Sequence, residues 1–497
     1  RLTGYDVMFL TGTDEHGQKI EDKARDAGVT PQQFVDNIVC GEKGILDLWK
    51  LMNISNDRFI RTTDDYHVAA IQNIFKKMHD NGDIYKGTYK GKYCKPCESF
   101  WTESQLVDGK CPDCGRDVED AEEEAYFFKL SKYADRVQHL LEDTDFLQPA
   151  SRVNEMVNNF IKPGLEDLCV SRTSFTWGIP VDFDPGHVVY VWVDALFNYC
   201  TALGFMNDKY DDYAKFWPAD VHFVGKEIVR FHSIIWPAML MSMDMPLPKH
   251  VYGHGWLVMD GGKMSKSKGN VVDPYVLAER FGVDALRFFL LRTFPFGSDG
   301  NFSNELLINR INMDLANDLG NLCNRSINMT RRYCDSVISG AEAYDDEASR
   351  ALRATMDQAV TLFSKYMDDN MVSDALAALN AQVSACNAYI EQQQPWQLAK
   401  DEASAPRLRC VLRHLLECCA QTGYLIGCVL PDASARILDQ LNAGDLFRSL
   451  TPAALEWGIL PAGHRINEPA PVFPRILSDE EKAKLAEKAA RAAKKQG

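Results

Sequence analysis

A loop rich in lysine, glycine and serine contains the residue types best suited to chemistry in this chain. It runs Gly261-Gly262-Lys263-Met264-Ser265-Lys266-Ser267-Lys268-Gly269-Asn270. Glycine lets the backbone adopt positive φ, and a lysine ammonium can follow a phosphate oxygen as charge shifts during nucleotidyl transfer. The loop therefore predicts a polyphosphate site that uses Lys263 and Lys266. The alternative is a solvated basic loop.

Four of the 14 cysteines form a second group with chemical meaning. Cys94 with Cys97, and Cys111 with Cys114, make two Cys-x-x-Cys pairs separated by 13 residues. This is close to the spacing of a four-thiolate zinc knuckle, and a closed shell of four sulfurs leaves no open position for substrate. We therefore expect Zn²⁺ in a structural role, with a redox pair or chance as the alternative. Most other cysteines occur singly, which is typical of reduced, buried thiols.

Aromatic and polar residues at helical spacing form a third group. Trp192, Ala195 and Tyr199 are separated by three and four residues, and Ile228 and His232 by four. Each set would share one face of a helix. The alternatives are core packing for the aromatic residues and a satisfied core histidine for His232.

An α/β region must position these groups. Tyr5–Leu10 reads as a buried strand, followed by a glycine-bearing turn and a helix from about Lys19. A second α/β stretch begins at residues 188–194, continues through 221–225 and ends after the lysine-rich loop. The pattern predicts a doubly wound, parallel-sheet catalytic domain of the Rossmann type, split by an insert that carries the four cysteines.

Long amphipathic helices replace this pattern from about residue 306, and we expect an all-α bundle. Asn321 and Arg325 are four apart and could present an amide and a guanidinium to base edges, while Trp396 could stack on an unpaired base. A solvated helix face and a core tryptophan are the alternatives. The expected domains are the first half of the catalytic domain, the insert, the second half, the helical domain and a tail: residues 1–86, 87–176, 177–305, 306–460 and 461–497.

Composition limits the possible classes of protein. At 497 residues the chain can form several cores, and it has no apolar run of 18 residues, so we do not expect it to span a membrane. The net charge of −16 argues weakly against nucleic acid as a partner. Charge is a whole-molecule average, however, and basic patches exist at residues 324–332 and 482–495.

Six segments in the same order resemble the methionyl-tRNA synthetases, which are class I aminoacyl-tRNA synthetases. The resemblance extends from Gly4 to about Leu460. The matching segments are Thr11-Gly12-Thr13-Asp14-Glu15-His16-Gly17, the four cysteines, Tyr190 to Leu196, Val224 to His232 with Trp236-Pro237-Ala238, the lysine-rich loop, and Pro395-Trp396.

The resemblance implies a site for L-methionine. It places Trp192, Ala195, Tyr199, Ile228 and His232 around the side chain, whose polarisable thioether favours aromatic contacts. Asp14 would hold the ammonium group through a charge-assisted hydrogen bond, although it could instead cap the nearby helix.

The resemblance also implies an ATP site with Mg²⁺ on the phosphates. Gly225 would let the backbone approach, Glu227 would accept hydrogen bonds from the ribose, and three further residues would pack on adenine: Trp256, Leu257 and Val258. Methionine carboxylate would attack the α-phosphorus, and the aminoacyl group would pass to tRNA(Met). No protein nucleophile is needed, so catalysis would rest on positioning and on Lys263 and Lys266. We discount Glu15 and His16 as an acid–base pair.

By the same resemblance, Asn321, Arg325 and Trp396 would read the CAU anticodon. A class I synthetase also carries a His-x-Gly-His type motif after its first strand, and no such motif precedes Tyr5. We expect that strand, motif and helix to lie ahead of Arg1, and the printed chain alone to activate methionine poorly.

Two other functions remain open. Synthetases for isoleucine, valine or leucine share the lysine-rich loop, but their editing insert is much larger than residues 87–176. A tRNA-binding protein that kept the fold and lost the chemistry is the second alternative. We expect a cytoplasmic protein, with an organelle as the alternative, and leave monomer or homodimer open.

Overall fold

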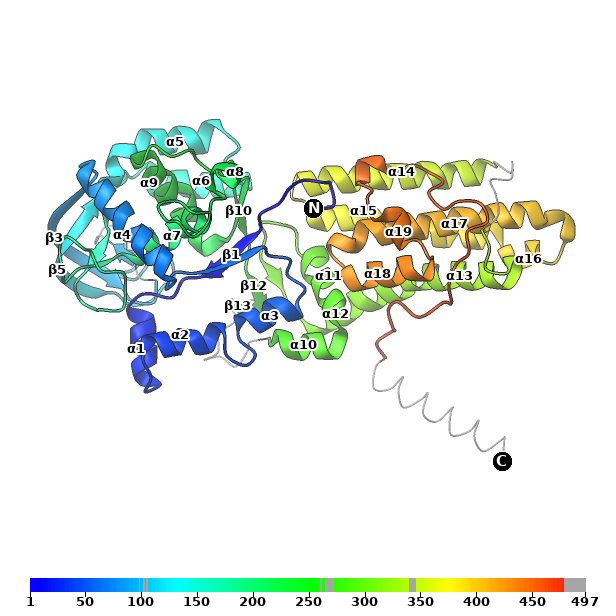
Figure 1. The fold of residues 1–497 in the computed structure, drawn as a ribbon, viewed down its shortest axis with the longest axis horizontal. Helices are drawn as coiled ribbons and strands as arrows, with labels where there is room; N and C mark the ends of the chain where they lie inside the picture. Colours follow the sequence, from blue (N-terminus) through cyan, green and yellow to red (C-terminus); the bar gives the residue numbers. More distant parts are fainter. Residues whose placement is uncertain are drawn as a thin grey trace, which may run out of the picture. The chain divides into compact units, whose positions relative to one another are not determined.

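The computed structural model describes residues 1–97, 99–101, 103, 106–259, 262–263, 272–338 and 346–477. The chain divides into two compact units. The α/β unit is Val7–Trp256, and the helical unit is Arg1–Asp6 together with Leu257–Gly497. Figure 1 shows strands mixed with helices in the first unit and long helices in the second. The domain boundaries expected from the sequence stay predictions.

Parallel strands form the centre of the α/β unit. β10 (Val221–Gly225), β11 (His250–His254) and β6 (Leu147–Gln148) lie side by side in the order β10-β11-β6, and both pairings are parallel. β1 (Leu10–Thr13) pairs in parallel with β2 (Arg58–Arg61). Parallel strands joined through helices confirm the expected α/β class. β6 lies within the range predicted for the insert, yet it pairs with β11.

The first strand begins later than predicted. Tyr5–Leu10 was expected to be a buried strand, but Tyr5 is 78% exposed, and parallel pairing starts only at Leu10 opposite Arg58. Asp57 ends the pairing on that side, because its carboxylate accepts the Phe9 N–H at 2.8 Å and its own N–H donates to Phe9 O. The prediction, which rested on apolar composition alone, therefore placed the start of this strand too early.

Helices surround the strands of the α/β unit and supply most of its core. Phe75, Phe197 and Trp236 are almost fully buried in one cluster that also includes Val224 and Val251 of the parallel sheet. The helices are α1 (Gln18–Asp26), α2 (Pro31–Val39), α3 (Ile45–Leu51), α4 (Asp65–Asp80), α5 (Ala134–Asp143), α6 (Ala150–Met156), α7 (Val191–Thr201), α8 (Tyr213–Phe216) and α9 (Trp236–Ser242). Short 3-10 and π turns, η4 (Lys226–Ile228) and η5 (Phe231–Ile235), connect β10 to α9.

The four cysteines lie at the end of one strand of an antiparallel sheet and in the connections between its strands. Its order is β4-β3-β5-β7, with β4 (Ser99–Trp101), β3 (Ile84–Cys94), β5 (Glu119–Phe128) and β7 (Leu168–Cys169). A further antiparallel pair, β8 (Ser171–Arg172) and β9 (Val188–Val189), leads into α7. The range predicted for the insert thus combines an antiparallel sheet with helices α5 and α6, and its strand β6 pairs with β11 of the parallel sheet.

The helical unit begins with three short strands and two helices. β12 (Leu257–Met259) pairs with β13 (Gly262–Lys263) and β14 (Gly300–Asn301). Beyond the lysine-rich loop the chain forms α10 (Pro274–Phe281) and α11 (Val283–Thr293). Gly282 separates them at φ +86°, a conformation that residues with a side chain rarely adopt.

The remainder of the helical unit is the expected bundle. Its helices are α12 (Asn304–Arg310), the π-helix η7 (Ile311–Gly320), α13 (Asn321–Cys334), α14 (Glu347–Asp368), α15 (Val372–Gln393), α16 (Pro395–Leu398), α17 (Ala405–Leu425), α18 (Pro431–Gln440) and α19 (Gly444–Phe447). α17 is buried along most of its length. The Glu417 carboxylate on this helix accepts the backbone N–H groups of residues 458–460, which fixes the following segment to the bundle.

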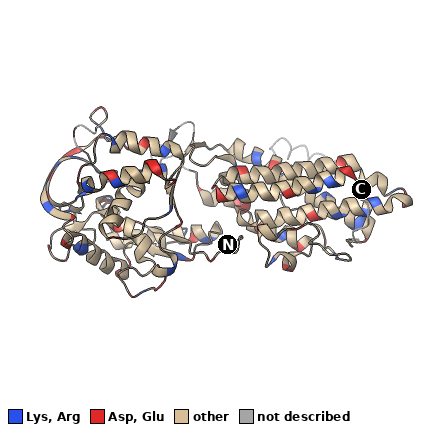
Figure 2. Cartoon of the chain, turned by 90° about the horizontal axis from the view of Figure 1, so that it is seen from above, with Lys and Arg blue, Asp and Glu red and all other residues tan. Residues whose placement is uncertain are grey.

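Charged residues of both signs are interspersed along the helices of the bundle (Figure 2). Within the described residues, no helix combines the length and the apolar character needed to cross a membrane. The tail beyond residue 477, which contains the basic patch noted at residues 482–495, lies outside the described residues.

Candidate functional site

Helix α7 brings the predicted methionine residues onto one element. Trp192, Ala195 and Tyr199 all lie within α7, so the helical spacing assumed from the sequence is confirmed. Ala195 is 7% exposed, whereas Trp192 and Tyr199 are half-buried. Asp14 directly follows β1 and is exposed at the carboxyl end of that strand.

Tyr199 and His232 are joined by a hydrogen bond. The Tyr199 hydroxyl lies 2.7 Å from His232 Nε2, and His232 Nδ1 lies 3.0 Å from the carbonyl oxygen of Ile228. Because a carbonyl can only accept, Nδ1 carries the proton and donates to Ile228. A neutral ring then leaves Nε2 as an acceptor, so the Tyr199 hydroxyl donates to it. The predicted residues Tyr199, Ile228 and His232 are therefore held together.

Burial keeps these groups uncharged. Loss of hydration lowers the pKa of His232 to about 4, with a smaller opposing effect from the Ile228 carbonyl, and lowers the pKa of neighbouring His222 to about 3. Burial also raises the pKa of Tyr199, and the Asp14 carboxylate adds to this shift. At neutral pH the Tyr199 hydroxyl and the rings of His232 and His222 are therefore uncharged.

Two further rings complete the group. Phe231 stacks on Trp192 with ring centroids 3.7 Å apart and an interplanar angle of 7°, and His232 meets the edge of Trp192 at 6.2 Å. We call Trp192, Tyr199, Phe231 and His232 the ring cluster. Phe231 was not singled out from the sequence, although it lies inside the quoted segment Val224 to His232. Its helical spacing from Ile228 could have identified it.

A buried carboxylate lies on the same helix as the ring cluster. Asp194 is 1% exposed, and its oxygens lie 2.7 Å from His16 Nδ1 and 2.7 Å from His67 Nε2. Burial raises its pKa, but the hydrogen bonds from the two histidines outweigh this and hold the pKa below the ordinary value. Sequence reasoning missed this network, because its members come from three distant segments.

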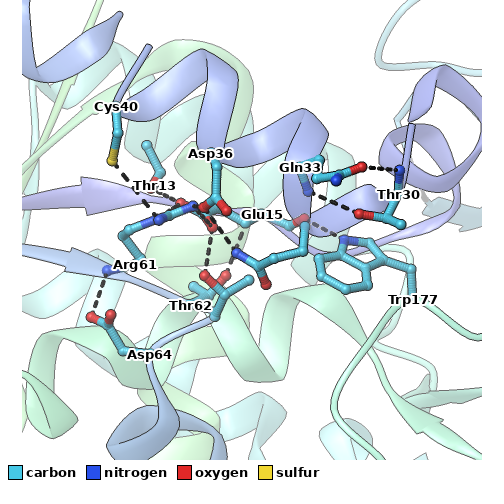
Figure 3. Close-up of polar contacts among 12 residues, drawn as sticks. Thr13, Glu15, Thr30, Gln33, Asp36, Cys40, Arg61, Thr62, Asp64 and Trp177 are labelled. Atoms are coloured by element: carbon cyan, nitrogen blue, oxygen red, sulfur yellow. Dashed lines mark hydrogen bonds and ion pairs between the residues drawn. The ribbon is translucent and has the colours of Figure 1, made fainter. Parts of the chain in front are cut away.

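Glu15 is a structural residue at the end of β1. Its carboxylate accepts from Arg61 Nε at 2.7 Å, from Arg61 Nη2 at 2.9 Å and from the Thr63 hydroxyl at 2.6 Å, as Figure 3 shows for the arginine. Trp177 donates its indole N–H to the backbone oxygen of Glu15. A carboxylate bound by an arginine fork is a poor base, which agrees with discounting Glu15 in acid–base chemistry.

The predicted nucleotide residues of the α/β unit gather after β10. Gly225 ends that strand, and a side chain there would meet the Glu227 carboxylate, since an added Cβ would lie 2.5 Å from Glu227 Oε2. The same oxygen accepts the indole N–H of Trp256 at 2.7 Å, and Lys226 Nζ lies 4.1 Å from the centre of the Trp256 ring. Gly225, Glu227 and Trp256 are thus neighbours.

The remaining nucleotide candidates belong to the helical unit. Leu257 and Val258 form β12, and Val258 pairs with Lys263 of β13. Lys266 lies outside the described residues, so the structure does not test the roles of Lys263 and Lys266.

The four cysteine sulfurs cluster, with all of them within 4.8 Å of one another. The sulfurs of Cys94 and Cys114 are 3.6 Å apart, and those of Cys97 and Cys111 are 3.9 Å apart. A tetrahedron with Zn–S bonds of about 2.3 Å has edges of about 3.8 Å, so the donor set fits a zinc ion. Gly115, at φ +68°, lets the chain turn directly after Cys114.

The predicted anticodon residues lie in the helical unit. Asn321 begins α13, and Arg325 follows one turn later. The Arg325 guanidinium pairs with Glu391 at 2.7 Å and lies 5.7 Å from the centre of the Trp396 ring. Asn321 lines a recess of about 390 Å³ that Phe473 also lines. The structure therefore brings Arg325 and Trp396 together, with Asn321 on the same helix.

Comparison with known families matches nearly the whole sequence. Residues 1–123 and 116–327 match the family described as tRNA synthetases class I (M), and residues 339–494 match the anticodon binding domain of methionyl tRNA ligase. The second match lies within the helical unit, whereas the first extends from the α/β unit into the helical unit as far as residue 327.

Individual relatives extend this agreement. The chain is 56% identical over 490 residues to the methionine–tRNA ligase of Clostridium perfringens, covering 98% of this chain and 74% of the relative. It is also 56% identical over 493 residues to the methionine–tRNA ligase of Caldanaerobacter subterraneus, covering 98% of this chain and 76% of that relative. A crystal structure of Mycobacterium tuberculosis methionyl-tRNA synthetase bound by methionyl-adenylate superposes with a TM-score of 0.89 at 42% identity, covering 95% of this chain and 93% of the other. The chain therefore belongs to the methionyl-tRNA synthetase family of class I aminoacyl-tRNA synthetases.

Proposed function

We propose that this chain ligates L-methionine to tRNA(Met) in an ATP-dependent reaction through methionyl-adenylate, and so supplies translation initiation and elongation. Family membership supports the reaction class. The observation that carries the choice of amino acid is the neutral Tyr199–His232 pair beside the stacked rings of Trp192 and Phe231. Such a group favours an uncharged, polarisable side chain over a charged or strongly hydrated one.

The ring cluster and its neighbours would divide the recognition of methionine. Trp192, Ala195 and Ile228 would contact the apolar side chain. The Tyr199 hydroxyl donates its hydrogen bond to His232 and so needs no second acceptor. Its oxygen can therefore contact the weakly polar thioether sulfur of methionine. Asp14, which is exposed directly after β1, would bind the methionine ammonium group.

Catalysis would rest on orientation and charge rather than on a protein nucleophile. The methionine carboxylate attacks the α-phosphorus of ATP and pyrophosphate leaves. Gly225, Glu227 and Trp256 would bind the nucleoside, with Leu257 and Val258 at adenine. The proposed roles of Lys263 and Lys266, stabilising negative charge on the phosphates, rest on the sequence of their loop. Mg²⁺ bound with ATP would neutralise phosphate charge.

The four cysteines would hold a structural Zn²⁺. The fit of the sulfur separations supports this assignment. Zinc bound through four thiolates would stabilise the insert, because the core of buried residues around these cysteines is small, comprising Cys94, Trp101 and Cys111. We expect one zinc per chain by elemental analysis of protein purified without chelator. A chain that is folded and active without bound metal would contradict it.

Asn321, Arg325 and Trp396 would select tRNA(Met) through its anticodon. The test is aminoacylation of transcripts with the CAU anticodon and with a substituted first anticodon base, using a chain that carries the predicted front motif. We expect methionine to be attached to the CAU transcript and charging of the substituted transcript to fall by about 10- to 100-fold, the value of one base contact. Equal charging of both would contradict this assignment, and binding of tRNA without any charging would favour the non-catalytic alternative.

A further inference from the structure

Arg230 lies between the four-cysteine cluster and the ring cluster without belonging to either. It precedes Phe231 at the start of η5. Its guanidinium carbon lies 4.4 Å from the ring centre of Trp101, 4.9 Å from that of Phe231 and 5.2 Å from that of Phe160. All three distances are within the range of a cation–π contact. One planar cation therefore contacts three aromatic rings from different segments.

Trp101 connects this cation to the cysteines. It is 2% exposed and forms a small core of its own with Cys94 and Cys111. Phe160 packs against the same core. Because two of the four candidate zinc ligands lie in this core, the position of the Trp101 ring depends on how the cysteine segments fold.

Phe231 connects the same cation to the methionine candidates. Its ring lies parallel to that of Trp192 at 3.7 Å, and the next residue along the chain is His232. A change in the rotamer of Phe231 would remove the surface on which Trp192 stacks. The contacts thus form a continuous series of Trp101, Arg230, Phe231 and Trp192.

We propose that Arg230 is a positioning residue that couples the folding of the four-cysteine cluster to the affinity for methionine. Its guanidinium, held on Trp101, fixes the ring of Phe231 and through it the ring of Trp192. The inference rests on the proposed methionine site. It gives the insert a role in substrate recognition in addition to its own stability.

Arginine suits this position because of its shape as well as its charge. The guanidinium is planar and weakly hydrated, so it can lie flat on one ring while contacting a second. Lysine would keep the charge but present a compact, strongly hydrated ammonium, and methionine would keep the length of the side chain but lose both charge and plane. The pair R230K and R230M therefore separates the contribution of charge from that of stacking.

The test is ATP/pyrophosphate exchange kinetics of R230M and R230K, in a chain with the predicted front motif, compared with the parent. We expect R230M to raise the methionine KM about tenfold, as for loss of a desolvated cation–π contact, with the ATP KM and zinc content within about twofold of the parent. R230K should show an intermediate rise. The control is R136M, which removes an arginine 6.0 Å from the Tyr133 ring and should leave the methionine KM unchanged.

A double-mutant cycle tests the connection to the cysteine cluster. W101L alone should raise the methionine KM, and adding R230M should raise it little further, because both remove the same contact. Additive effects, equal rises in the KM values for methionine and ATP, or a methionine KM for R230M within twofold of the parent would each overturn the proposal. If R230M fails to fold, the methionine KM of R230K is the test. A methionine KM of R230K equal to that of the parent would then overturn the proposal. A parent that shows no methionine-dependent exchange would instead overturn the proposed function.

Discussion

The ring cluster of the α/β unit and the anticodon candidates of the helical unit differ first in their exposure to water. His232 is 1% exposed, and its only polar partners in the described residues are a hydroxyl and a backbone carbonyl. The side chains of Arg325 and Glu391 are 28% and 62% exposed and carry full charges. The ring cluster is neutral, with Phe231 and His232 buried and Trp192 and Tyr199 half-buried, whereas the Arg325–Glu391 pair is charged and partly solvated.

This difference follows from the two ligands. A methionine side chain offers little besides apolar surface and one polarisable sulfur, so selectivity depends on water-free contact with rings already in position. An anticodon offers base edges, stacking faces and phosphates, so recognition favours amide, guanidinium and indole groups that reach into solvent. In the helical unit, Glu391 pairs with Arg325, and under the proposed function RNA would displace it.

The largest expected effect is on the buried side. W192A would remove the ring that stacks on Phe231 and meets His232. Loss of such an aromatic contact costs about 2–4 kcal/mol, so we expect the methionine KM to rise roughly 30- to 1000-fold. Exchange kinetics measure this change. The Kd for tRNA, measured by filter binding, should stay constant, and a parallel loss of tRNA binding would break the separation between the two regions.

The next effect is on the exposed side. W396A would remove the stacking surface beside Arg325, and a stacked base contributes about 1–3 kcal/mol. We expect kcat/KM for tRNA to fall about 10- to 100-fold in charging assays while methionine-dependent exchange is unchanged. W457A serves as the control, since Trp457 packs on His414 instead and should leave tRNA charging at the parental rate. Comparable losses in both variants would contradict the assignment of Trp396.

The histidines of the buried region should produce a pH-dependent stability. The folded pKa values of about 4 for His232 and about 3 for His222 lie below the ordinary value of 6.5. The unfolded chain therefore binds more protons between these values, so the stabilisation is complete above pH 6.5 and is lost as pH falls toward 4.

We expect Tm of the parent to fall by several degrees between pH 6.5 and 4.5, as an order of magnitude for two buried histidines. H232Q, which keeps a hydrogen-bond acceptor and cannot be protonated, should show a smaller fall over the same range. An identical pH dependence for H232Q and the parent would show that His232 is not held neutral by burial.

The smallest expected effect has the opposite sign. E391Q would release Arg325 and remove a negative charge near the proposed RNA site. We expect the Kd for tRNA to decrease about two- to fivefold at low salt, the value of an exposed ion pair, and the gain to shrink as salt increases. E468Q is the matched control, because Glu468 pairs with Arg331 on the same helix. Weaker binding by E391Q would show that Glu391 orients Arg325 for RNA.

Spacing within one element was the part of the fold and site most accessible from the sequence. Trp192, Ala195 and Tyr199 were placed on one helix, and α7 confirms that helix, because a periodic local pattern depends only on neighbouring residues. The two Cys-x-x-Cys pairs were recognised for the same reason, and their sulfurs cluster.

Contacts between distant segments were not accessible. Asp194 is separated from His16 by 178 residues and from His67 by 127, so no local pattern pairs them. The start of β1 was misplaced because strand limits depend on the partner strand, and Arg58 pairs with Leu10 rather than with an earlier residue. The position of Arg230 between two aromatic groups depends equally on the folding of the insert.

ATP/pyrophosphate exchange across methionine, isoleucine, leucine, valine and cysteine tests the central claim most directly. It uses a chain that carries the predicted front motif and reports the first chemical step without tRNA. We predict exchange that depends on methionine, with the other four about 10- to 200-fold lower in kcat/KM, since one ill-fitting apolar group costs about 1–3 kcal/mol. Preferred exchange with any of the other four, or none with methionine, would contradict the assignment of the ring cluster as a methionine site.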